Sequence, residues 1–372
     1  MIRFEHVTKR YADGTTAVDD LSFEVAEGEL ITLVGPSGCG KTTTMKMVNR
    51  LIEPTEGRVF LDGEDIATTD PVRLRRRIGY VIQQVGLFPH KTVLDNTATV
   101  PHLLGTPRAE ARARAAELLD LVGLDPRKYG DRYPEQLSGG QRQRVGVARA
   151  LAADPPVLLM DEPFGAVDPV VREHLQNEFL RLQSQVRKTV LLVTHDLDEA
   201  VRLGDRIAVY GHGTIEQFDT PATVLGAPAT PYVADFVGSD RSLKRLSVTT
   251  VDRADLEEAP VLRADGNTTA PAAPGAVVLD ADDRPTGRDG TGPAAVPLGT
   301  TLKDALAVLL RGDTGRLPVT DPADGGRYAG VLTPAGVHRA LRRAQPRPAG
   351  PTSPDGPAAA PGRPAEDPLS RR

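Results

Sequence analysis

A glycine-rich segment near the N-terminus has the residue types that bind nucleotide phosphates. Residues 35–42 read GPSGCGKT and match the pattern G-x-x-x-x-G-K-[ST]. In such a loop, glycines let backbone N–H groups approach phosphate oxygens, and the N-terminus of the following helix adds positive potential. Lys41 would neutralise the β- and γ-phosphates, and Thr42 would ligate Mg²⁺. A chance glycine-rich turn is the alternative, but the apolar run before the loop and the helix-compatible segment after it favour phosphate binding.

Two adjacent carboxylates could complete the chemistry of such a site. Residues 157–160 read VLLM and lead directly into Asp161 and Glu162. An aspartate at the end of an apolar strand can hold the Mg²⁺ of a P-loop nucleotide site, and the next glutamate can orient and deprotonate water. Two solvated acids at a strand end would be the ordinary interpretation of this pair alone. The phosphate-loop pattern makes that interpretation the weaker one.

A serine and two glycines form a second candidate anion site. Residues 137–141 read LSGGQ and precede a segment, 142–151, that is expected to be helical. Ser138 and the glycines would then lie at a helix N-terminus, which attracts anions by the same physics as the first loop. A Ser-Gly-Gly sequence alone is usually a turn, so the other motifs decide in favour of function.

Three short apolar runs indicate the elements that must position these residues. Residues 30–34, 157–160 and 190–193 are apolar apart from Thr32, which is typical of strands in a parallel sheet covered by helices on both faces. Buried helix segments are the alternative, but the runs are too short for helices. Ligands of such sheets lie beyond the carboxyl ends of the strands. The phosphate loop, the two carboxylates and His195 should therefore converge on one edge.

The segment between the first two strands contains a helical pattern. Residues 107–122 have apolar side chains at helical spacing, with Pro107 at the expected first helical position and Thr106 placed as a cap. We expect an inserted helical subdomain here.

Composition excludes several classes of function. The 372 residues carry a net charge of −5, so there is no excess of positive charge to attract nucleic acid independently of its sequence. We therefore expect no nucleic-acid partner. Cys39 is the single cysteine and cannot form an internal disulfide, which favours a reducing compartment. The N-terminus lacks the apolar region of a signal peptide, and no apolar run is long enough to cross a bilayer. Any role at the membrane should be peripheral, with no direct insertion.

Together the motifs resemble those of ABC ATPases. GPSGCGKTT is similar to the Walker A motif, LSGGQ to the signature and VLLMDEP to Walker B, and the resemblance covers residues 1–238. It implies an α/β fold, a P-loop NTPase of ABC type with a parallel-sheet core and a helical subdomain. It also implies ATP and Mg²⁺ as cofactors and ATP hydrolysis as the activity.

The resemblance implies roles that residue spacing does not show. Tyr11 would stack on adenine, Gln83 would be the Q-loop residue, and His195 would be the switch at the γ-phosphate. Asp168 would belong to the D-loop, which reads GAVD instead of the more usual SALD; because the aspartate is retained, we expect activity to be intact. Without the resemblance, these residues would be a surface tyrosine, a solvated glutamine, a capping histidine and a turn aspartate.

The expected site combines the motifs with these implied roles. Catalysis is expected of Glu162, His195 and Gln83, and Mg²⁺ binding of Thr42, Gln83 and Asp161. The nucleotide is expected to contact Tyr11, Gly35, Pro36, Ser37, Gly38, Cys39, Gly40, Lys41, Thr42, Thr43, Ser138, Gly139, Gly140, Gln141 and Asp168.

The family resemblance also implies partners. Two subunits would meet head to tail, with each ATP between Lys41 of one and Ser138 of the other. This homodimer would bind transmembrane permease subunits and work with a substrate-binding protein, at the cytoplasmic face of the cell membrane.

Two stretches within the resemblance indicate the substrate. Residues 78–90 look like the Q-loop of importers for quaternary amines such as glycine betaine, proline, choline or carnitine, and residues 236–246 are also typical of that group. An importer motor for methionine or a polyamine, or an exporter motor, is the alternative. An ABC ATPase acting on DNA or ribosomes is a further one, but the chain has neither a long coiled coil between Lys41 and Ser138 nor a second set of motifs.

The remaining chain indicates a smaller second domain. A boundary is expected near Gly238, because apolar periodicity is sparser over 239–345. Residues 296–344 resemble one CBS repeat, and 277–282 look like a strand of a degenerate partner repeat. We expect a small degenerate CBS-like α+β domain with a regulatory role; a packing or dimerisation module is the alternative. Residues 346–372 are proline-rich with almost no bulky apolar side chains, and are expected to be disordered.

Overall fold

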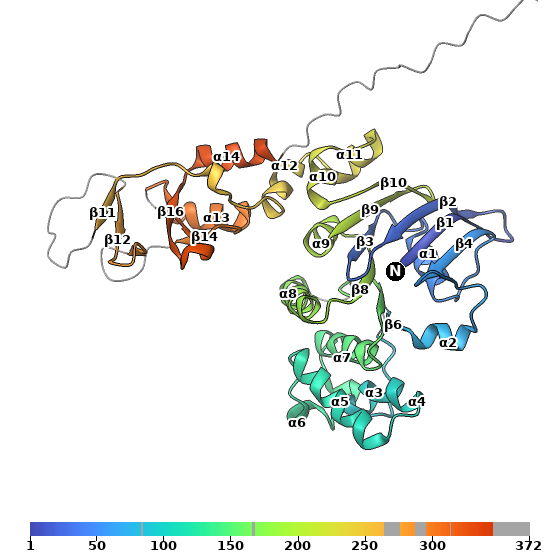
Figure 1. Ribbon diagram of the computed structural model, residues 1–372. Helices are drawn as coiled ribbons and strands as arrows, with labels where there is room; N and C mark the ends of the chain where they lie inside the picture. The colour runs from blue at the N-terminus through green and yellow to red at the C-terminus, as the bar shows by residue number, and fades with distance from the viewer. Residues whose placement is uncertain (83–84, 166–167, 264–275, 287–294, 313, 345–372) are drawn as a thin grey trace, which may run out of the picture.

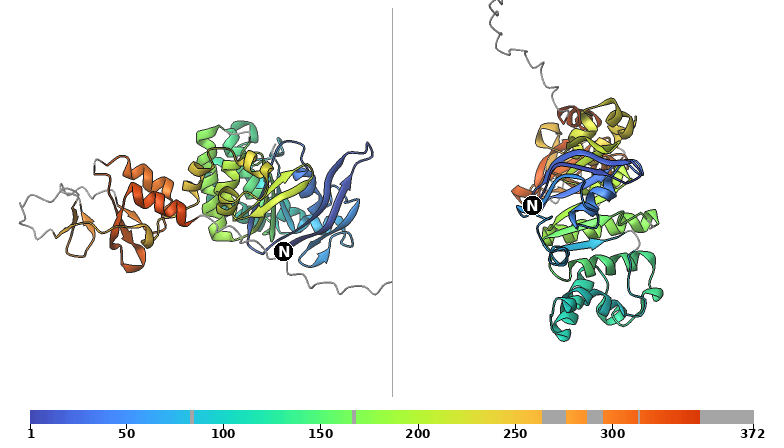
Figure 2. Two further views of the ribbon diagram at one scale, coloured as in Figure 1. Left: turned by 90° about the horizontal axis from the view of Figure 1, so that it is seen from above. Right: turned by 90° about the vertical axis from the view of Figure 1, so that its right-hand side faces the viewer.

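The computed structural model describes residues 1–82, 85–165, 168–263, 276–286, 295–312 and 314–344. Gln83 and the proline-rich segment 346–372, on which two of the predictions above fall, lie outside these described residues. The described chain forms two successive groups of sheets and helices, and the second group extends from one side of the first (Figures 1 and 2).

A six-stranded sheet forms the centre of the first group. Its order is β10-β9-β3-β8-β7-β6, with β10 antiparallel at one edge and the other strands parallel. The strands are β3 (Leu30–Val34), β6 (Ile78–Val81), β7 (Val157–Asp161), β8 (Thr189–Thr194), β9 (Arg206–Gly211) and β10 (Thr214–Asp219). All residues of β3 and β8 are buried. The three apolar runs are therefore confirmed as strands of a parallel core.

Both faces of this sheet are covered. Leu191 and Val193 of β8 belong to one hydrophobic cluster, whereas Val190 and Leu192 belong to another on the opposite face. The first cluster includes α1 (Lys41–Val48) and a second, four-stranded antiparallel sheet. The strands of that sheet are β1 (Ile2–Arg10), β2 (Thr16–Val25), β4 (Glu56–Leu61) and β5 (Glu64–Asp65). The helix that follows the phosphate loop is thus held by both sheets.

A helical subdomain lies below the central sheet in Figure 1. Its helices are α3 (Val93–Thr97), α4 (Thr99–Leu103), α5 (Arg108–Leu121), α6 (Pro126–Tyr129) and α7 (Gly139–Leu151). The subdomain itself was expected, but the start of α5 was not. Pro107 has an extended ψ of 141°, so it is the N-cap residue and not the first helical residue, and no side chain caps the helix. The prediction that Thr106 is the cap is wrong.

The remaining helices of the first group are α2 (Pro71–Arg76), α8 (Pro169–Val186), α9 (Leu197–Leu203), α10 (Pro221–Gly226) and α11 (Pro231–Val237). Three of them precede or connect core strands, and α10 and α11 follow the last strand, β10. α8 and α7 pack on one face of the sheet through the cluster that contains Leu175, Phe179 and Val145. Within the described residues, none of the helices is long and apolar enough to cross a membrane.

The second group has two small sheets with the same strand pattern. In each, the first strand pairs parallel with the second, and the second pairs antiparallel with the third. The strands are β11 (Val261–Arg263), β12 (Val277–Leu279) and β13 (Pro285–Thr286), then β14 (Val296–Pro297), β15 (Leu317–Asp321) and β16 (Arg327–Leu332). α13 (Leu302–Leu309) and α14 (Pro334–Arg343) pack on the second sheet. This group has its own hydrophobic cluster, whose members come from the sequence range Leu246 to Ala340.

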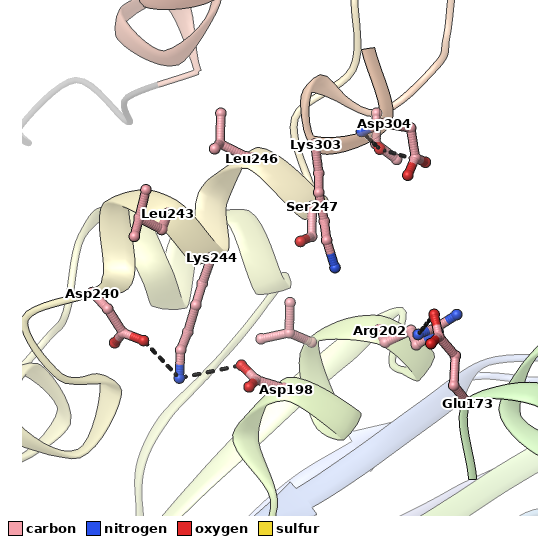
Figure 3. Close-up of a pocket in the computed structure, with 12 residues that line it drawn as sticks. Glu173, Asp198, Arg202, Asp240, Leu243, Lys244, Leu246, Ser247, Lys303 and Asp304 are labelled. Carbon is pink, nitrogen blue, oxygen red and sulfur yellow. Dashed lines mark hydrogen bonds and ion pairs between the residues drawn. The ribbon is translucent and has the colours of Figure 1, made fainter. Parts of the chain in front are cut away.

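A cleft of about 660 Å³ lies where the two groups meet (Figure 3). Its walls come from α8 and α9, from α12 (Arg241–Lys244) and the turn after it, and from the start of α13. Lys244 joins the groups, because its Nζ lies 3.2 Å from a carboxylate oxygen of Asp198 on α9.

Candidate nucleotide-binding site

The loop from Gly35 to Gly40 connects β3 to α1 and has a backbone that only glycine permits at two positions. Gly40 has a φ of 106°, and a Cβ there would lie 2.1 Å from the carbonyl oxygen of Ala17. A Cβ at Gly35 would lie 2.6 Å from the carbonyl oxygen of Tyr210. Any side chain at either position would force the backbone to move. Pro36, Ser37 and Gly38 lie between them and are exposed, as a loop that receives a ligand requires.

Lys41 directs its ammonium group into this loop. The residue is only 5 % exposed, and its Nζ donates hydrogen bonds to the carbonyl oxygens of Gly35 at 2.8 Å and Pro36 at 2.7 Å. The Sγ of the buried Cys39 lies 3.4 Å from the same nitrogen. A buried cation in a ring of backbone dipoles is placed to bind an anion that enters the loop.

Two of the expected Mg²⁺ ligands are in direct contact. The Thr42 hydroxyl donates a hydrogen bond of 3.1 Å to the Asp161 carboxylate, which joins the start of α1 to the end of β7. Burial raises the pKa of Asp161, and the bond from Thr42 and the charges of Lys46 and Lys41 oppose that shift. A hydroxyl and a carboxylate oxygen are hard ligands of the kind that Mg²⁺ prefers, so these residues fit the metal.

Glu162 and His195 come from neighbouring strands and meet at the sheet edge. His195 Nδ1 lies 3.2 Å from a carboxylate oxygen of Glu162. Glu162 has a φ of 44°, uncommon for a residue with a side chain, and its N–H donates a 2.9 Å hydrogen bond to the carbonyl of Val193. A left-handed conformation fixed by a neighbouring strand turns Glu162 out of the strand direction toward the histidine. Such strain often marks functional sites.

Tyr11 lies beside the phosphate loop. Its hydroxyl is 3.3 Å from the hydroxyl of Thr43, and its ring is 39 % exposed. The Lys9 ammonium lies 5.4 Å from the centre of the ring, which it contacts by a cation–π interaction. An exposed aromatic ring tethered next to a phosphate site can stack on a base.

The remaining predicted residues lie apart from the phosphate loop. Ser138 is the N-cap of α7, where its hydroxyl accepts a bond from the Gln141 N–H and Gln141 Oε1 accepts one from the Ser138 N–H. Gly139 and Gly140 form the first turn of this helix in the helical subdomain, away from α1 (Figure 1). Asp168 is the N-cap of α8. Over the described ranges, no hydrogen bond or ion pair joins Ser138 to residues 35–43.

Three structural residues were missed by sequence reasoning. Arg149 donates hydrogen bonds to the carbonyl oxygens of Val85 at 2.6 Å and Gly86 at 2.8 Å, so α7 holds the segment that follows Gln83. Tyr210 is fully buried beneath the phosphate loop, and its hydroxyl donates a 3.1 Å bond to Thr44 of α1.

Tyr80 is the third of these residues, and burial together with the Asp161 charge raises its pKa to about 12. No sequence signal distinguishes any of these three residues from an ordinary surface arginine or core tyrosine.

Comparison with known proteins identifies the family. The ABC transporter family model matches residues 18–165. The Osmoprotectant import ATP-binding protein OsmV of Salmonella typhimurium is 46 % identical over 363 residues, which cover 90 % of this chain and 94 % of that protein. The Glycine betaine/carnitine/choline transport ATP-binding protein OpuCA of Bacillus subtilis is 55 % identical over 244 residues, or 66 % of this chain and 64 % of that protein.

A solved structure has the same nucleotide-binding fold. It is a dimer of an ATP-binding cassette in a post-hydrolysis state with ADP and Pi, 36 % identical, with a TM-score of 0.53 over 59 % of this chain and 99 % of that one. The resemblance to ABC ATPases drawn from the motifs is therefore confirmed. With the phosphate loop, the carboxylate pair and the histidine at one sheet edge, this chain belongs to the ABC transporter family, as one of its ATP-binding, ATP-hydrolysing subunits.

Proposed function

We propose that this chain powers an importer for quaternary amines or related osmoprotectants such as glycine betaine, proline, choline or carnitine. The observation that carries the proposal is the extent of the alignment with the osmoprotectant import protein. It covers 90 % of this chain and so extends beyond residues 18–165, which any ABC ATPase shares, into the C-terminal group. The resemblance of residues 78–90 and 236–246 to quaternary-amine importers supports the same substrate class.

In the proposed mechanism, the sheet edge binds ATP and directs water at its γ-phosphate. Lys41 binds the phosphates within the loop, and Tyr11 stacks on adenine. Thr42 and Asp161 would hold Mg²⁺, which would supply positive charge to neutralise the phosphates. Glu162 accepts the proton of the attacking water. His195, whose Nδ1 lies 3.2 Å from the Glu162 carboxylate, stabilises charge at the γ-phosphate. Gln83, outside the described residues, is proposed to contact Mg²⁺ and water.

The active unit is proposed to be a head-to-tail dimer. Ser138, Gly139, Gly140 and Gln141 lie in the helical subdomain of the same chain, remote from the phosphate loop, so a second copy would have to supply them to each ATP. We further propose that the dimer binds permease subunits at the cytoplasmic face of the membrane and works with a substrate-binding protein.

We propose that residues 1–238 are the ATP-binding domain and residues 239–345 a degenerate CBS-like regulatory domain. Support comes from the repeated strand pattern of the two small sheets and from the helices α13 and α14 on the second sheet. Among the described residues from 248 to 286, no α-helix accompanies the first sheet. The Glu257 carboxylate accepts hydrogen bonds of 3.0 Å from Thr333, the N-cap of α14, and from Arg339 within that helix. A carboxylate of the chain itself therefore lies at the start of α14.

The general-base role is tested with Glu162→Gln. The amide keeps the size of the side chain but removes its basicity, so ATP should bind and hydrolysis should fall about 10²- to 10⁴-fold. The stalled protein should accumulate as a nucleotide-bound dimer. The Lys41→Ala protein should neither bind the nucleotide nor form the dimer. ATPase rate, nucleotide affinity and size-exclusion profile measure these effects. A Glu162→Gln protein with near-normal hydrolysis would remove Glu162 from the mechanism.

The metal role is tested with Asp161→Asn and thermal unfolding at pH 7. Because burial raises the pKa of Asp161, the folded chain holds this proton more tightly than the unfolded chain, and the ionised form lowers stability at neutral pH. The nucleotide-free variant should therefore unfold at the same or a higher temperature than the parent. The stabilisation by Mg²⁺ and ATP should be lost. Glu24→Gln, at an exposed position of β2, is the control; lower stability of ligand-free Asp161→Asn contradicts the argument.

The substrate class is tested by transport. Reconstituted with its permease and binding protein, the complex should take up labelled glycine betaine, choline or a relative when ATP is present. The Glu162→Gln complex is the matched control and should be inactive. Uptake of methionine, a sugar or a polyamine alone would show that the substrate assignment is wrong.

The degenerate domain is tested by calorimetry on full-length Lys41→Ala, whose ATP site is disabled. We expect weak or absent binding of adenine dinucleotides, because the described part of the first sheet lacks helices and Glu257 occupies the start of α14. Submicromolar affinity would overturn this expectation.

A further inference from the structure

We propose that Glu199 on α9 is a positioning residue for His195 and acts through the Thr194 hydroxyl. The inference rests on the proposed role of His195 at the γ-phosphate. It concerns a buried carboxylate that, within the described residues, has no hydrogen bond or ion pair to residues 35–42 and has no part in the mechanism described above.

Glu199 is a charged group in an interior position. It is only 5 % exposed, and its carboxylate accepts hydrogen bonds from the Thr194 hydroxyl and, at 3.1 Å, from Gln176 Nε2 on α8. Both donors are neutral, and Thr194 and Gln176 are themselves buried. Burial raises the pKa of Glu199, and the bonds from Thr194 and Gln176 together with the charge of Arg172 oppose that shift only in part. An apolar side chain would fill this position at lower cost, so stability alone does not explain the carboxylate.

The other carboxylates near Glu199 have a different environment. Asp198, the preceding residue on α9, is 72 % exposed and pairs with Lys244 at 3.2 Å across the cleft. Glu173 on α8 is 63 % exposed and pairs with Arg202 at 3.1 Å. Figure 3 shows these two pairs at the cleft. They are solvated ion pairs of the ordinary surface kind, whereas Glu199 points inward to the end of β8.

The Thr194 hydroxyl connects Glu199 to the turn that carries His195. It donates to Glu199 and accepts a 3.0 Å hydrogen bond from the backbone N–H of Asp196. Because a hydroxyl has one proton, donation to Glu199 leaves its lone pairs for the Asp196 N–H. The residues on both sides of His195 are thereby joined through one oriented hydroxyl. The turn that carries the imidazole toward Glu162 is fixed by this bond.

Asp196 also contacts a side chain of α8. Its carboxylate caps α9 by accepting from the N–H groups of Asp198 and Glu199, and it lies 3.5 Å from an Arg172 nitrogen. Arg172 and Gln176 are one turn apart on α8, the helix whose N-cap is Asp168. One network therefore links the proposed D-loop helix, α9 and the two neighbours of His195.

The test compares Glu199→Gln with an exchange variant. The amide is uncharged and has one acceptor oxygen in place of two, so Thr194 and Gln176 can no longer donate to separate oxygens of residue 199. We expect the kcat for ATP hydrolysis to fall about tenfold while the affinity for ATP stays within twofold. In Gln176→Glu/Glu199→Gln, the new carboxylate accepts from the amide at 199, whose oxygen accepts from Thr194. This exchange should restore kcat to within about threefold of the parent.

Two further variants separate the possible outcomes. Glu173→Gln, on the exposed side of α8, is the matched control and should retain its activity. His195→Ala tests the proposed function by itself: normal hydrolysis in that variant refutes the role of His195. If His195→Ala is inactive but Glu199→Gln keeps its kcat, the positioning role of Glu199 alone is wrong. Weakened ATP binding in Glu199→Gln, or an exchange variant that stays impaired, also overturns the proposal in favour of a purely structural role.

Discussion

The parallel pairing of β3, β8 and β7 is the constraint on which the site depends. Val34 is paired with Thr194, and Asp161 with Val193, so the three strands end at nearly the same level of the sheet. The residues that follow, the phosphate loop, Glu162 and His195, leave the sheet together. A shift of one residue in this register would also exchange the side chains that enter the two hydrophobic clusters. Burial of both faces thus fixes the geometry of the edge.

Internal partners hold the side chains of the proposed site in place. Lys41 is bonded to two loop carbonyls, Thr42 to Asp161, and His195 lies against Glu162. A bound nucleotide must replace these contacts, so the free energy of binding is a difference between two sets of polar interactions. In return, the side chains are already ordered, and less conformational entropy is lost when ATP enters.

Residues outside the phosphate loop contribute to this order. Tyr210 bonds to Thr44 beneath the loop, Arg149 holds the segment after the Q-loop position, and Glu199 fixes the residues around His195. The same short helix, α9, carries Asp198, which contacts Lys244 at the junction with the C-terminal group. The histidine turn and the second group of sheets are therefore separated by a single helix of seven residues.

The sequence by itself determined the nucleotide loop, the carboxylate pair, the core strands and the family, because each of these is encoded in contiguous residues. Apolar runs of four or five residues specify buried strands, and glycines at fixed spacing specify a loop that phosphates can approach. The start of α5 was misplaced because Thr106 and Pro107 form a pattern that fits two adjacent helix starts, and only the extended backbone at Pro107 distinguishes them.

The tertiary structure alone decided which side chains support the site. Glu199 and Asp198 are adjacent acids on one helix, and nothing in their sequence shows that one enters the interior while the other meets solvent. Gln176 reaches Glu199 across 23 positions of sequence, and Tyr210 reaches Thr44 across 166. Such contacts depend on how helices and strands pack against one another, and packing is the sum of many weak, distant interactions that no local pattern records.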